Sequence, residues 1–417
     1  MKILKFGGAA IKDGRSIKNI VKILQIYKDS EVVIVISAMG KTTNALEKVI
    51  SCYFNSKSKL QSALQEIKKY HNSILLELFD DENHKIFSSI DKLFKDLQMF
   101  LNLNKSPNYN YVYDQIICFG ELVSTKIISG YLNHKGWKNS LLDARDMIKT
   151  NNNYRRAKVD WNKTKEKIIS LIKKRENIVT QGYIASDSNN FTTTLGREGS
   201  DYSAAIFGYC LNAQSVCVWK DVPGILNSDP RYFKNSILLN SLSYEEAIEL
   251  SYYGASVIHP KTLQPLKRKE IPLYVKSFFK PNEKGTKVGK NLSLNPDIPC
   301  YIIRKNQILI SISSLDFSYI LEDNIYQIFK LFNQNKIKVN LIQNSAITFI
   351  VCVEDINDNL NNLLIDLKAK YNVNIYKKVN IYSIRNYNES AIKKIEKNKK
   401  ILVKQITQKT VQMVSQE

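Results

Sequence analysis

The most informative stretch of this 417-residue chain is residues 192–205, which read TTTLGREGSDYSAA. A turn rich in threonine and glycine carries one arginine and leads into a predicted helix of small residues. The planar guanidinium of Arg197 can bind a carboxylate through two parallel hydrogen bonds. Asp201, near the start of the helix, can cap that helix or bind a cation. These residue types together indicate a turn that binds a small ligand.

On either side of this turn, short runs of β-branched residues alternate with helical patterns. The predicted strands are Ile3–Phe6, Val32–Ile36, Asn177–Thr180, Ser215–Trp219 and Pro272–Lys276, and the predicted helices include Ser16–Tyr27 and one that begins around Asn44. The lysine-rich residues 57–104 are expected to form a helical excursion from the sheet. The alternation predicts an α/β fold, a three-layer sandwich with a mainly parallel central sheet.

Residues 280–299 are punctuated by proline and glycine, and we place a domain boundary there. The elements predicted after it are, in order, a strand at 308–313, a helix at 322–333, strands at 338–342 and 347–353, a helix at 360–371 and a strand at 375–384. This βαββαβ order is typical of a ferredoxin-like small-ligand module. The expected domains are therefore residues 1–290 and 300–417.

The chain is strongly basic, with 61 basic and 39 acidic residues and a formal net charge of +22. Such a charge is also found in proteins that bind nucleic acid. The lysines are scattered among asparagines and isoleucines along the whole length, whereas a nucleic-acid surface concentrates them on one face. We therefore interpret the charge as compositional drift and expect no nucleic-acid partner.

The six cysteines show no paired short spacing of the kind that metal sites and redox motifs require. They are expected to be buried free thiols in a reducing compartment. No run of about 18 apolar residues is present, and no signal-type apolar core precedes the first predicted strand. The sequence therefore predicts a cytoplasmic protein with no membrane contact.

Two further segments follow predicted strands at the edge where ligands of open α/β sheets bind. Residues 5–8, KFGG, offer a cation and bare backbone that can bind phosphate oxygens, although the same residues also suit an ordinary tight turn. Residues 37–44, SAMGKTTN, offer hydroxyl groups and a helix start. Gly40-Lys41-Thr42 resembles part of a P-loop, but Val35 stands where that motif requires a glycine, and we reject it.

Three more positions carry chemistry. Glu121 lies in an otherwise hydrophobic helical stretch, either as a salt-bridged core residue or as a ligand for a substrate ammonium group. Residues 219–231, WKDVPGILNSDPR, end a strand with a charged turn that suits a loop lying along a nucleotide. His259 is expected to be a buried structural histidine rather than a ligand.

Together and in this order, these segments resemble the aspartate kinases of the amino acid kinase superfamily, over nearly the whole chain. The carboxyl-terminal part, with Ser314-Leu315 before its helix and residues 338–345 after it, resembles the ACT regulatory region of the same enzymes. The resemblance implies an amino acid kinase fold followed by ACT modules. It also implies ATP-dependent phosphorylation of the side-chain carboxylate of L-aspartate, the first step of lysine, threonine and methionine biosynthesis through diaminopimelate.

The resemblance further implies a role for each matching residue. Lys5 and Asp201 are expected to be catalytic, and the aspartate site is expected to comprise Ser37, Thr43, Glu121 and Arg197. The nucleotide site is expected to comprise Lys5, Gly7, Gly8, Lys220, Asp221 and Arg231. The implied cofactors are ATP and Mg²⁺, with no protein residue assigned to the metal. A homodimer or higher homo-oligomer, with lysine or threonine as effector at the ACT region, is also implied.

Some positions depart from the family pattern. Ala9 and Ala10 replace a Thr-Ser pair, Lys220 a threonine, Leu226 a tyrosine and Ser256 a lysine. Three alternatives therefore stay open: a kinase for another amino acid such as glutamate, an RNA-associated binding protein that uses the positive charge, and an inactive kinase kept as a regulatory partner.

Overall fold

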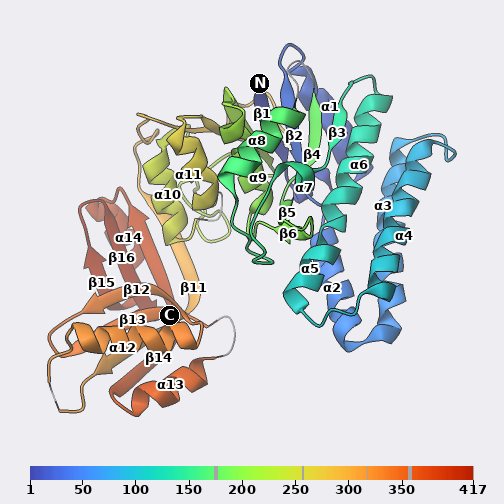
Figure 1. Cartoon of the computed structure of the whole chain (residues 1–417). Helices are drawn as coiled ribbons and strands as arrows, with labels where there is room; N and C mark the ends of the chain where they lie inside the picture. Colours follow the sequence, from blue (N-terminus) through green and yellow to red (C-terminus); the bar gives the residue numbers. More distant parts are fainter. Residues whose placement is uncertain (173–176, 256–257, 317, 356–358, 417) are drawn as a thin grey trace. The chain divides into compact units, whose positions relative to one another are not determined.

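The structure is a computed structural model that describes residues 1–172, 177–255, 258–316, 318–355 and 359–416. The chain forms two compact units (Figure 1). The first comprises Met1–Ile225, Leu238–Ser251 and Ser256–Pro296, and the second comprises Leu226–Ile237, Tyr252–Ala255 and Asp297–Glu417. The main division falls inside the proline-rich stretch 280–299. Two short earlier segments, 226–237 and 252–255, belong to the second unit, and the separate roles predicted for residues 1–290 and 300–417 stay a prediction.

The first unit is built on an eight-stranded sheet with the order β3-β4-β2-β1-β7-β9-β10-β8. The bounds are β1 Lys2–Phe6, β2 Val32–Ile36, β3 Ser140–Leu142, β4 Ile178–Gln181, β7 Ser215–Lys220, β8 Ser241–Ser243, β9 Leu273–Ser277 and β10 Thr286–Gly289. All neighbouring strands in this sheet are parallel except β9 and β10. The mainly parallel sheet predicted from the βα alternation is therefore confirmed.

The register of the central strands decides where a site can form. Phe6 at the end of β1 lies opposite Ile36 of β2 on one side and Trp219 of β7 on the other. The carboxyl ends of these three strands therefore meet at one edge of the sheet. Residues 7, 37 and 221 follow the three strands there, which is the edge where open α/β folds bind ligands.

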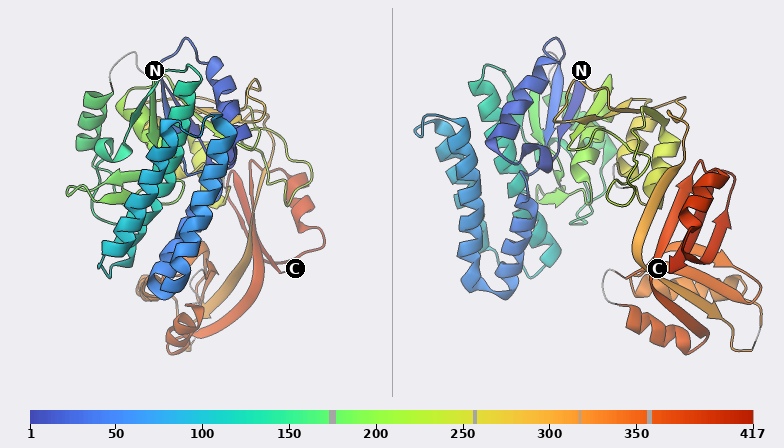
Figure 2. Two further views of the ribbon diagram at one scale, coloured as in Figure 1. Left: turned by 90° about the vertical axis from the view of Figure 1, so that its right-hand side faces the viewer. Right: turned by 180° about the vertical axis from the view of Figure 1, so that it is seen from behind.

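Helices cover both faces of this sheet because its central strands are apolar on both sides. Leu4 and Phe6 pack against Ile17 and Ile20 of helix α1 (Gly14–Gln25). The opposite face is covered by α8 (Trp161–Leu171) and α9 (Gly199–Cys210), where the bare Gly208 lies close to Ile3. Figures 1 and 2 show the two helical layers from the front and from behind. The result is the predicted three-layer sandwich.

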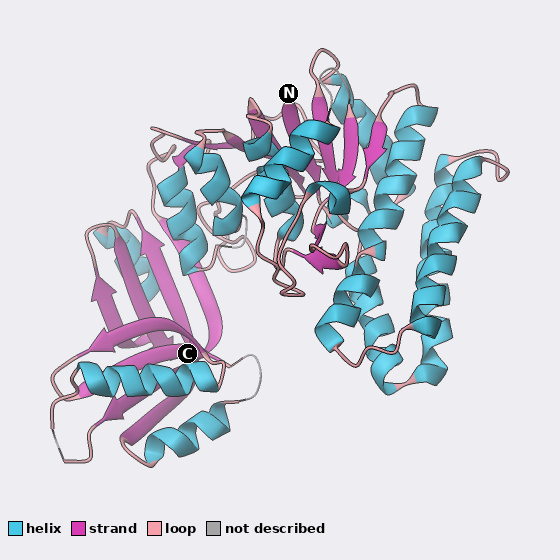
Figure 3. Ribbon diagram, in the orientation of Figure 1, coloured by secondary structure: helices cyan, strands magenta, loops and turns pink. Residues whose placement is uncertain are grey.

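The predicted helical excursion is confirmed as a set of long helices beside the sheet (Figure 3). Residues 57–104 form α3 Leu60–Leu78 and α4 Lys85–Leu103, and the helices α2 Thr42–Asn55, α5 Tyr109–Ile117 and α6 Phe119–His134 pack with them. Their apolar faces join the same core as β1 and β2. A short hairpin of β5 (Ile184–Ser186) and β6 (Thr192–Thr194) and the small helix α7 (Ala144–Met147) complete the region around the site, while α10 (Tyr244–Tyr253) and α11 (Pro260–Arg268) follow later in the chain.

The second unit contains a six-stranded antiparallel sheet with the order β12-β13-β11-β14-β16-β15. Its elements are β11 Cys300–Ser313, α12 Glu322–Gln334, β12 Lys338–Asn344, β13 Thr348–Glu354, α13 Leu360–Lys368, β14 Asn372–Arg385, α14 Glu389–Glu396, β15 Lys400–Ile406 and β16 Thr410–Gln416. The βαββαβ order predicted for this region is confirmed. The long strands β11 and β14 lie at the centre of the sheet and pair along most of their length, with bulges near the middle of β11. They join the half of the sheet that contains β12 and β13 to the half that contains β16 and β15.

Two further findings concern the whole chain. All six cysteines are free and buried, as expected from their spacing. Within the part of the chain that the structure describes, no helix is both long enough and apolar enough to span a bilayer.

Candidate active site

The centre of the site is a buried carboxylate that two lysines share. Asp201 lies in the first turn of α9 and is 2% exposed. Its Oδ1 lies 2.6 Å from the Nζ of Lys5 in β1, and its Oδ2 lies 3.1 Å from the Nζ of Lys220 at the end of β7. Neighbouring strands and the helix that packs on them therefore bring together three charges that are far apart in the sequence.

The electrostatics of this cluster leave an excess of positive charge. Burial would raise the pKa of Asp201, but the two ammonium groups outweigh burial and lower the pKa below its ordinary value. Asp201 is therefore an anion at neutral pH, and one carboxylate holds two cations. Two cations around one anion, at the carboxyl edge of the sheet, favour an anionic ligand such as a phosphate.

The turn after β1 brings bare backbone to the same edge. A side chain at Gly8 would place its Cβ 2.7 Å from the carbonyl oxygen of Ala38, so only glycine fits there. The N–H of Gly40 donates to the carbonyl of Gly8 across 3.0 Å, which ties this turn to the loop after β2. Gly7 and Gly8 are partly exposed next to buried Lys5, in the arrangement predicted for phosphate contact.

A second buried carboxylate, Glu121, lies in the first turn of α6 and is 3% exposed. Its Oε1 accepts a hydrogen bond from the N–H of Ala38 at 3.2 Å. Its Oε2 is buried without a hydrogen-bond partner among the residues that the structure describes. Burial raises the pKa of Glu121 to about 8, against the lowering effects of the Ala38 N–H and of the Lys5 charge. Without a cationic partner, the carboxyl group of Glu121 is therefore mostly protonated at neutral pH.

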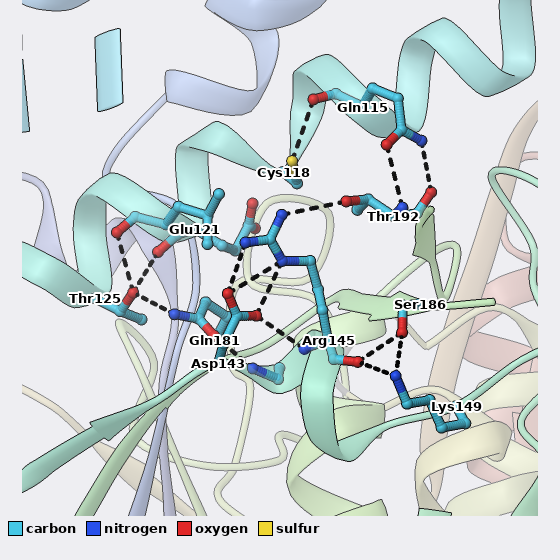
Figure 4. Close-up of polar contacts among 12 residues, drawn as sticks. Gln115, Cys118, Glu121, Thr125, Asp143, Arg145, Lys149, Gln181, Ser186 and Thr192 are labelled. Atoms are coloured by element: carbon cyan, nitrogen blue, oxygen red, sulfur yellow. Dashed lines mark hydrogen bonds and ion pairs between the residues drawn. The ribbon is translucent and has the colours of Figure 1, made fainter. Parts of the chain in front are cut away.

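A polar network fixes the helix turn that carries Glu121. The hydroxyl of Thr125 donates to the backbone carbonyl of Glu121 at 2.7 Å and accepts from the Nε2 of Gln181 at 2.9 Å. Gln181, at the end of β4, also accepts from the N–H of Ala144. Figure 4 shows this network beside the paired Asp143 and Arg145. The network therefore fixes the backbone from which the Glu121 side chain extends.

The other residues predicted to bind the substrate amino acid are placed as follows. Ser37 directly follows β2, and its carbonyl accepts from the hydroxyl of Ser124 one turn after Glu121. Thr43 lies in the first turn of α2. Both are partly exposed, and among the described residues neither hydroxyl has a hydrogen-bond partner. They are thus available to a ligand at the edge that Glu121 faces.

Arg197 lies on the loop between β6 and α9 and is exposed, with no ion pair or hydrogen bond to its guanidinium among the described residues. Its neighbours hold the loop in left-handed conformations, with φ of 79° at Gly196 and 54° at Glu198. Glu198 stands at the N-cap of α9, so Asp201 does not cap the helix as one alternative expected. Gly199 packs against the ring of Tyr183, and a Cβ at this position would lie 2.6 Å from the Cδ2 of that ring.

The predicted nucleotide loop is divided between the two units. Lys220 belongs to the cluster on Asp201, and Asp221 is exposed directly after it. Arg231 belongs to the second unit, where its guanidinium pairs with Asp229 at 2.6 Å in a bidentate contact. Its expected role at a nucleotide therefore stays a prediction.

One expectation was wrong. His259 is partly exposed and caps α11, where its Nδ1 accepts from the N–H of Lys261 at 3.2 Å. It is structural, as expected, but it is not buried, because a helix N-terminus at the surface takes its side chain. Ser256 lies outside the described residues. Asp114 and Gln181 were not among the predicted residues, because no motif marks them; Asp114 accepts hydrogen bonds from Arg155 and Thr194, and Gln181 contacts Thr125 and Ala144.

Comparison with known proteins agrees with this geometry. The family model described as "Amino acid kinase family" matches residues 1–277, about two thirds of the chain. The chain belongs to the amino acid kinase family. The matched range includes Lys5, Glu121, Asp201 and Lys220, and ends at the close of β9.

Among curated amino acid kinases, the chain is 29% identical over 371 residues to aspartokinase 1 of Arabidopsis thaliana, covering 84% of this chain and 63% of that protein. It is 28% identical over 364 residues to the lysine-sensitive aspartokinase 3 of Escherichia coli, covering 84% and 78%. A bifunctional aspartokinase/homoserine dehydrogenase of Buchnera aphidicola is 30% identical, and the chain spans 51% of it. The chain thus spans less than two thirds of some of these relatives.

Solved structures extend the likeness to the whole fold. Escherichia coli aspartokinase III in complex with aspartate and ADP superposes with a TM-score of 0.84 at 25% identity, covering 100% of this chain and 96% of that one. Clostridium acetobutylicum aspartate kinase gives a TM-score of 0.80 at 21% identity, which supports the fold alone. The architecture is therefore an amino acid kinase fold followed by ACT-type modules.

Proposed function

We propose that this protein catalyses ATP-dependent phosphorylation of the side-chain carboxylate of L-aspartate to 4-phospho-L-aspartate. The observation that carries the proposal is the pair of buried carboxylates, Asp201 with two lysines and Glu121 with an unpaired oxygen. Similarity to aspartokinases over most of the chain supports the same substrate. The reaction would be the first step of lysine, threonine and methionine biosynthesis through diaminopimelate.

The reaction requires the protein mainly to position the two substrates and to neutralise the charge of the transferred group. The attacking carboxylate of aspartate is ionised at neutral pH, so no general base is needed. Phosphoryl transfer then depends on holding donor and acceptor in line and on neutralising the charge of the transferred group. Lys5 and Lys220 would supply the positive charge, and Asp201 would hold the two ammonium groups in position.

Recognition of the amino acid would use the second carboxylate. An ammonium group bound at Glu121 would donate a hydrogen bond to the unpaired Oε2. Its positive charge would lower the pKa of Glu121, so that this carboxyl group would lose its proton. Ser37 and Thr43 would add hydroxyl contacts, and the free guanidinium of Arg197 would bind a carboxylate of the substrate. Ala38 links the expected ammonium site to the glycine turn, because its N–H donates to Glu121 and its carbonyl oxygen lies beside Gly8.

The nucleotide would place its phosphates at Gly7, Gly8 and the two lysines, with Asp221 next along the loop. No cluster of three or more His, Cys, Asp or Glu side chains suited to a metal occurs among the described residues. Mg²⁺ would therefore be bound mainly by the phosphates and water, as it commonly is in kinases, where it neutralises phosphate charge.

The second unit suggests regulation by an amino acid. A structure of Escherichia coli aspartokinase III in complex with lysine and aspartate superposes with a TM-score of 0.83 at 25% identity. We infer that lysine or threonine acts as effector at the ACT region of a homodimer or higher homo-oligomer. The cytoplasmic location expected from the sequence stays a prediction.

The test is ATP turnover with magnesium and L-aspartate, with the acyl phosphate trapped by hydroxylamine. We expect hydroxamate that depends on aspartate, is absent with L-glutamate or without amino acid, and is strongly reduced in Arg197→Ala. Folded wild-type protein that forms no hydroxamate from aspartate would exclude the assignment. Hydroxamate from glutamate instead would identify a different member of the family.

A further inference from the structure

A second arginine lies beside Arg197 on a separate loop. Residues 151–157 form a turn that packs against the end of β6. The N–H of Arg155 donates to the Oδ2 of Asp114 at 2.8 Å, and the N–H of Ala157 donates to the carbonyl of Thr194 at 2.9 Å. Arg156 therefore lies between two anchored residues, and the start of its side chain is fixed.

The turn reaches the residue just before Arg197. A Cβ built on Gly196 would lie 3.6 Å from the Cγ of Arg156 and 3.3 Å from the carbonyl oxygen of Arg155. The stem of Arg156 therefore packs beside Gly196, whose φ of 79° favours glycine at that position. Arg155 itself is left-handed, with φ of 66°, an uncommon conformation for a residue other than glycine and one often found at functional sites.

The charges around this turn are not balanced. Arg156 and Arg197 are both exposed, and neither guanidinium has a hydrogen-bond or ion-pair partner among the described residues. Arg155 differs, since its guanidinium lies 4.3 Å from the ring centroid of Tyr113. Glu198 is the nearest acid in sequence, but its Oε2 is buried without a hydrogen-bond partner in the described structure. Arg156 and Arg197 therefore extend from neighbouring parts of the backbone, and no acidic side chain among the described residues pairs with either guanidinium group.

We propose that Arg156 is a substrate-binding residue that, with Arg197, binds the α-carboxylate of the amino acid, the carboxylate that is not phosphorylated. This inference rests on the proposed function. Two guanidinium groups that converge on one carboxylate remove the repulsion between them and offer more donors than one arginine can. The β-carboxylate is thereby left to the phosphate cluster at Lys5.

Asp114 is the positioning residue for both loops. It is fully buried in α5, and it accepts from the N–H of Arg155 and from the N–H and hydroxyl of Thr194 at 2.8 to 2.9 Å. Thr194 ends the strand that leads to Gly196 and Arg197. One carboxylate thus holds the backbone of both arginine-bearing loops, so that their separation is set from inside the core.

The test compares L-aspartate with its 1-amide, which keeps the β-carboxylate but lacks the α-carboxylate. In wild-type enzyme, we expect kcat/KM to fall when the amide replaces aspartate. Arg156→Gln should raise the KM for aspartate about tenfold to a hundredfold, with little change for the amide. The preference for aspartate should shrink by the same factor. Lys158→Gln, which removes a charge from an exposed position two residues further on, is the matched control.

Two further readouts separate binding from a loss of structure. Added guanidinium ion should restore part of the aspartate affinity of Arg156→Ala, and the KM for ATP should stay unchanged. Wild-type preference for aspartate over the amide in Arg156→Gln, or a KM equal to that of Lys158→Gln, would overturn the proposal while the proposed activity stands. Wild-type enzyme that forms no hydroxamate from aspartate would overturn both.

Discussion

Asp201 and Glu121 are both buried carboxylates in the first turn of a helix, at the same edge of the same sheet, and they differ in charge. Asp201 has an ammonium group on each oxygen, which lowers its pKa. Glu121 has one backbone N–H on one oxygen, and burial raises its pKa to about 8. Burial is common to the two residues, so the difference comes from the partners that the fold supplies.

This difference matches two chemical tasks. A permanently ionised carboxylate can hold cations in place for an anionic phosphate. A carboxyl group that is protonated without a cationic partner and ionises on contact with an ammonium group suits a ligand that carries a positive charge. In the proposed function, phosphate and the amino acid would therefore bind at different buried carboxylates, which differ in whether they have cationic partners.

The largest effect is expected from Asp201→Asn. The change removes the negative charge that holds Lys5 and Lys220, so the two ammonium groups should separate. We expect kcat to fall by about 10²- to 10³-fold, the size found when a preorganised electrostatic group is removed. Steady-state hydroxamate formation measures the effect, with circular dichroism to check folding. A variant that keeps wild-type kcat would show that Asp201 does not organise the lysines.

A smaller effect is expected from Lys220→Met. Lys5 and Asp201 remain paired in this variant, so one of the two cations is kept. We expect kcat to fall about tenfold to a hundredfold, while Lys220→Arg keeps most of the activity because it keeps the charge. If Lys220→Thr, which restores the residue common in the family, matches the wild type, then the second lysine has no part in transfer.

Glu121 should give an effect that depends on pH. Its pKa is about 8 without a cationic partner, and an ammonium partner lowers the pKa, so aspartate binding releases a proton below pH 8. The KM for aspartate should therefore fall by up to about tenfold for each unit that pH rises between 6.5 and 8, and then level off. Glu121→Gln should raise KM and abolish this slope. A wild-type KM that is flat over this range would show that Glu121 is already ionised.

The smallest effect is expected from Asp114→Asn. Burial raises the pKa of this carboxyl to about 6, against the donors from Arg155 and Thr194, so it is mainly ionised at neutral pH. The amide can accept on one atom only, and we expect a stability loss of about 1 to 3 kcal/mol with a severalfold rise in the KM for aspartate. Urea unfolding and the hydroxamate assay measure the two quantities. Thr194→Val, which loses one donor to the same carboxylate, should show the same change in weaker form.

Much of the fold was predictable because its strands are short, apolar and separated by clear helical patterns. Val32–Ile36 was predicted with the bounds that the structure has, since every residue in it is apolar and polar residues flank it. The antiparallel β10 and the edge strand β15 were missed. Their lysines and glutamine do not show the alternation of a half-buried strand, and their place depends on neighbours distant in sequence.

The site was predictable in part. Glu121 was predicted to be functional or paired, because a carboxylate inside an apolar helix is costly to bury without a partner. The two alternatives were a salt bridge in the core and a ligand for an ammonium group. The structure provides no salt bridge to Glu121 among the described residues. The contact of Lys220 with Asp201 could not be predicted, because it depends on β7 being the neighbour of β1. The same holds for Asp114, whose three donors come from two loops far along the chain.

The measurement that tests the contrast between the two carboxylates most directly is the number of protons released when aspartate binds. Calorimetric titration of L-aspartate at pH 7, in two buffers of different ionisation enthalpy, gives that number. The account predicts release of close to one proton by the wild type and none by Glu121→Gln, with Asp201→Asn still releasing it. Binding without proton release by the wild type, or equal release by Glu121→Gln, would contradict the assignment of Glu121 as the ammonium site.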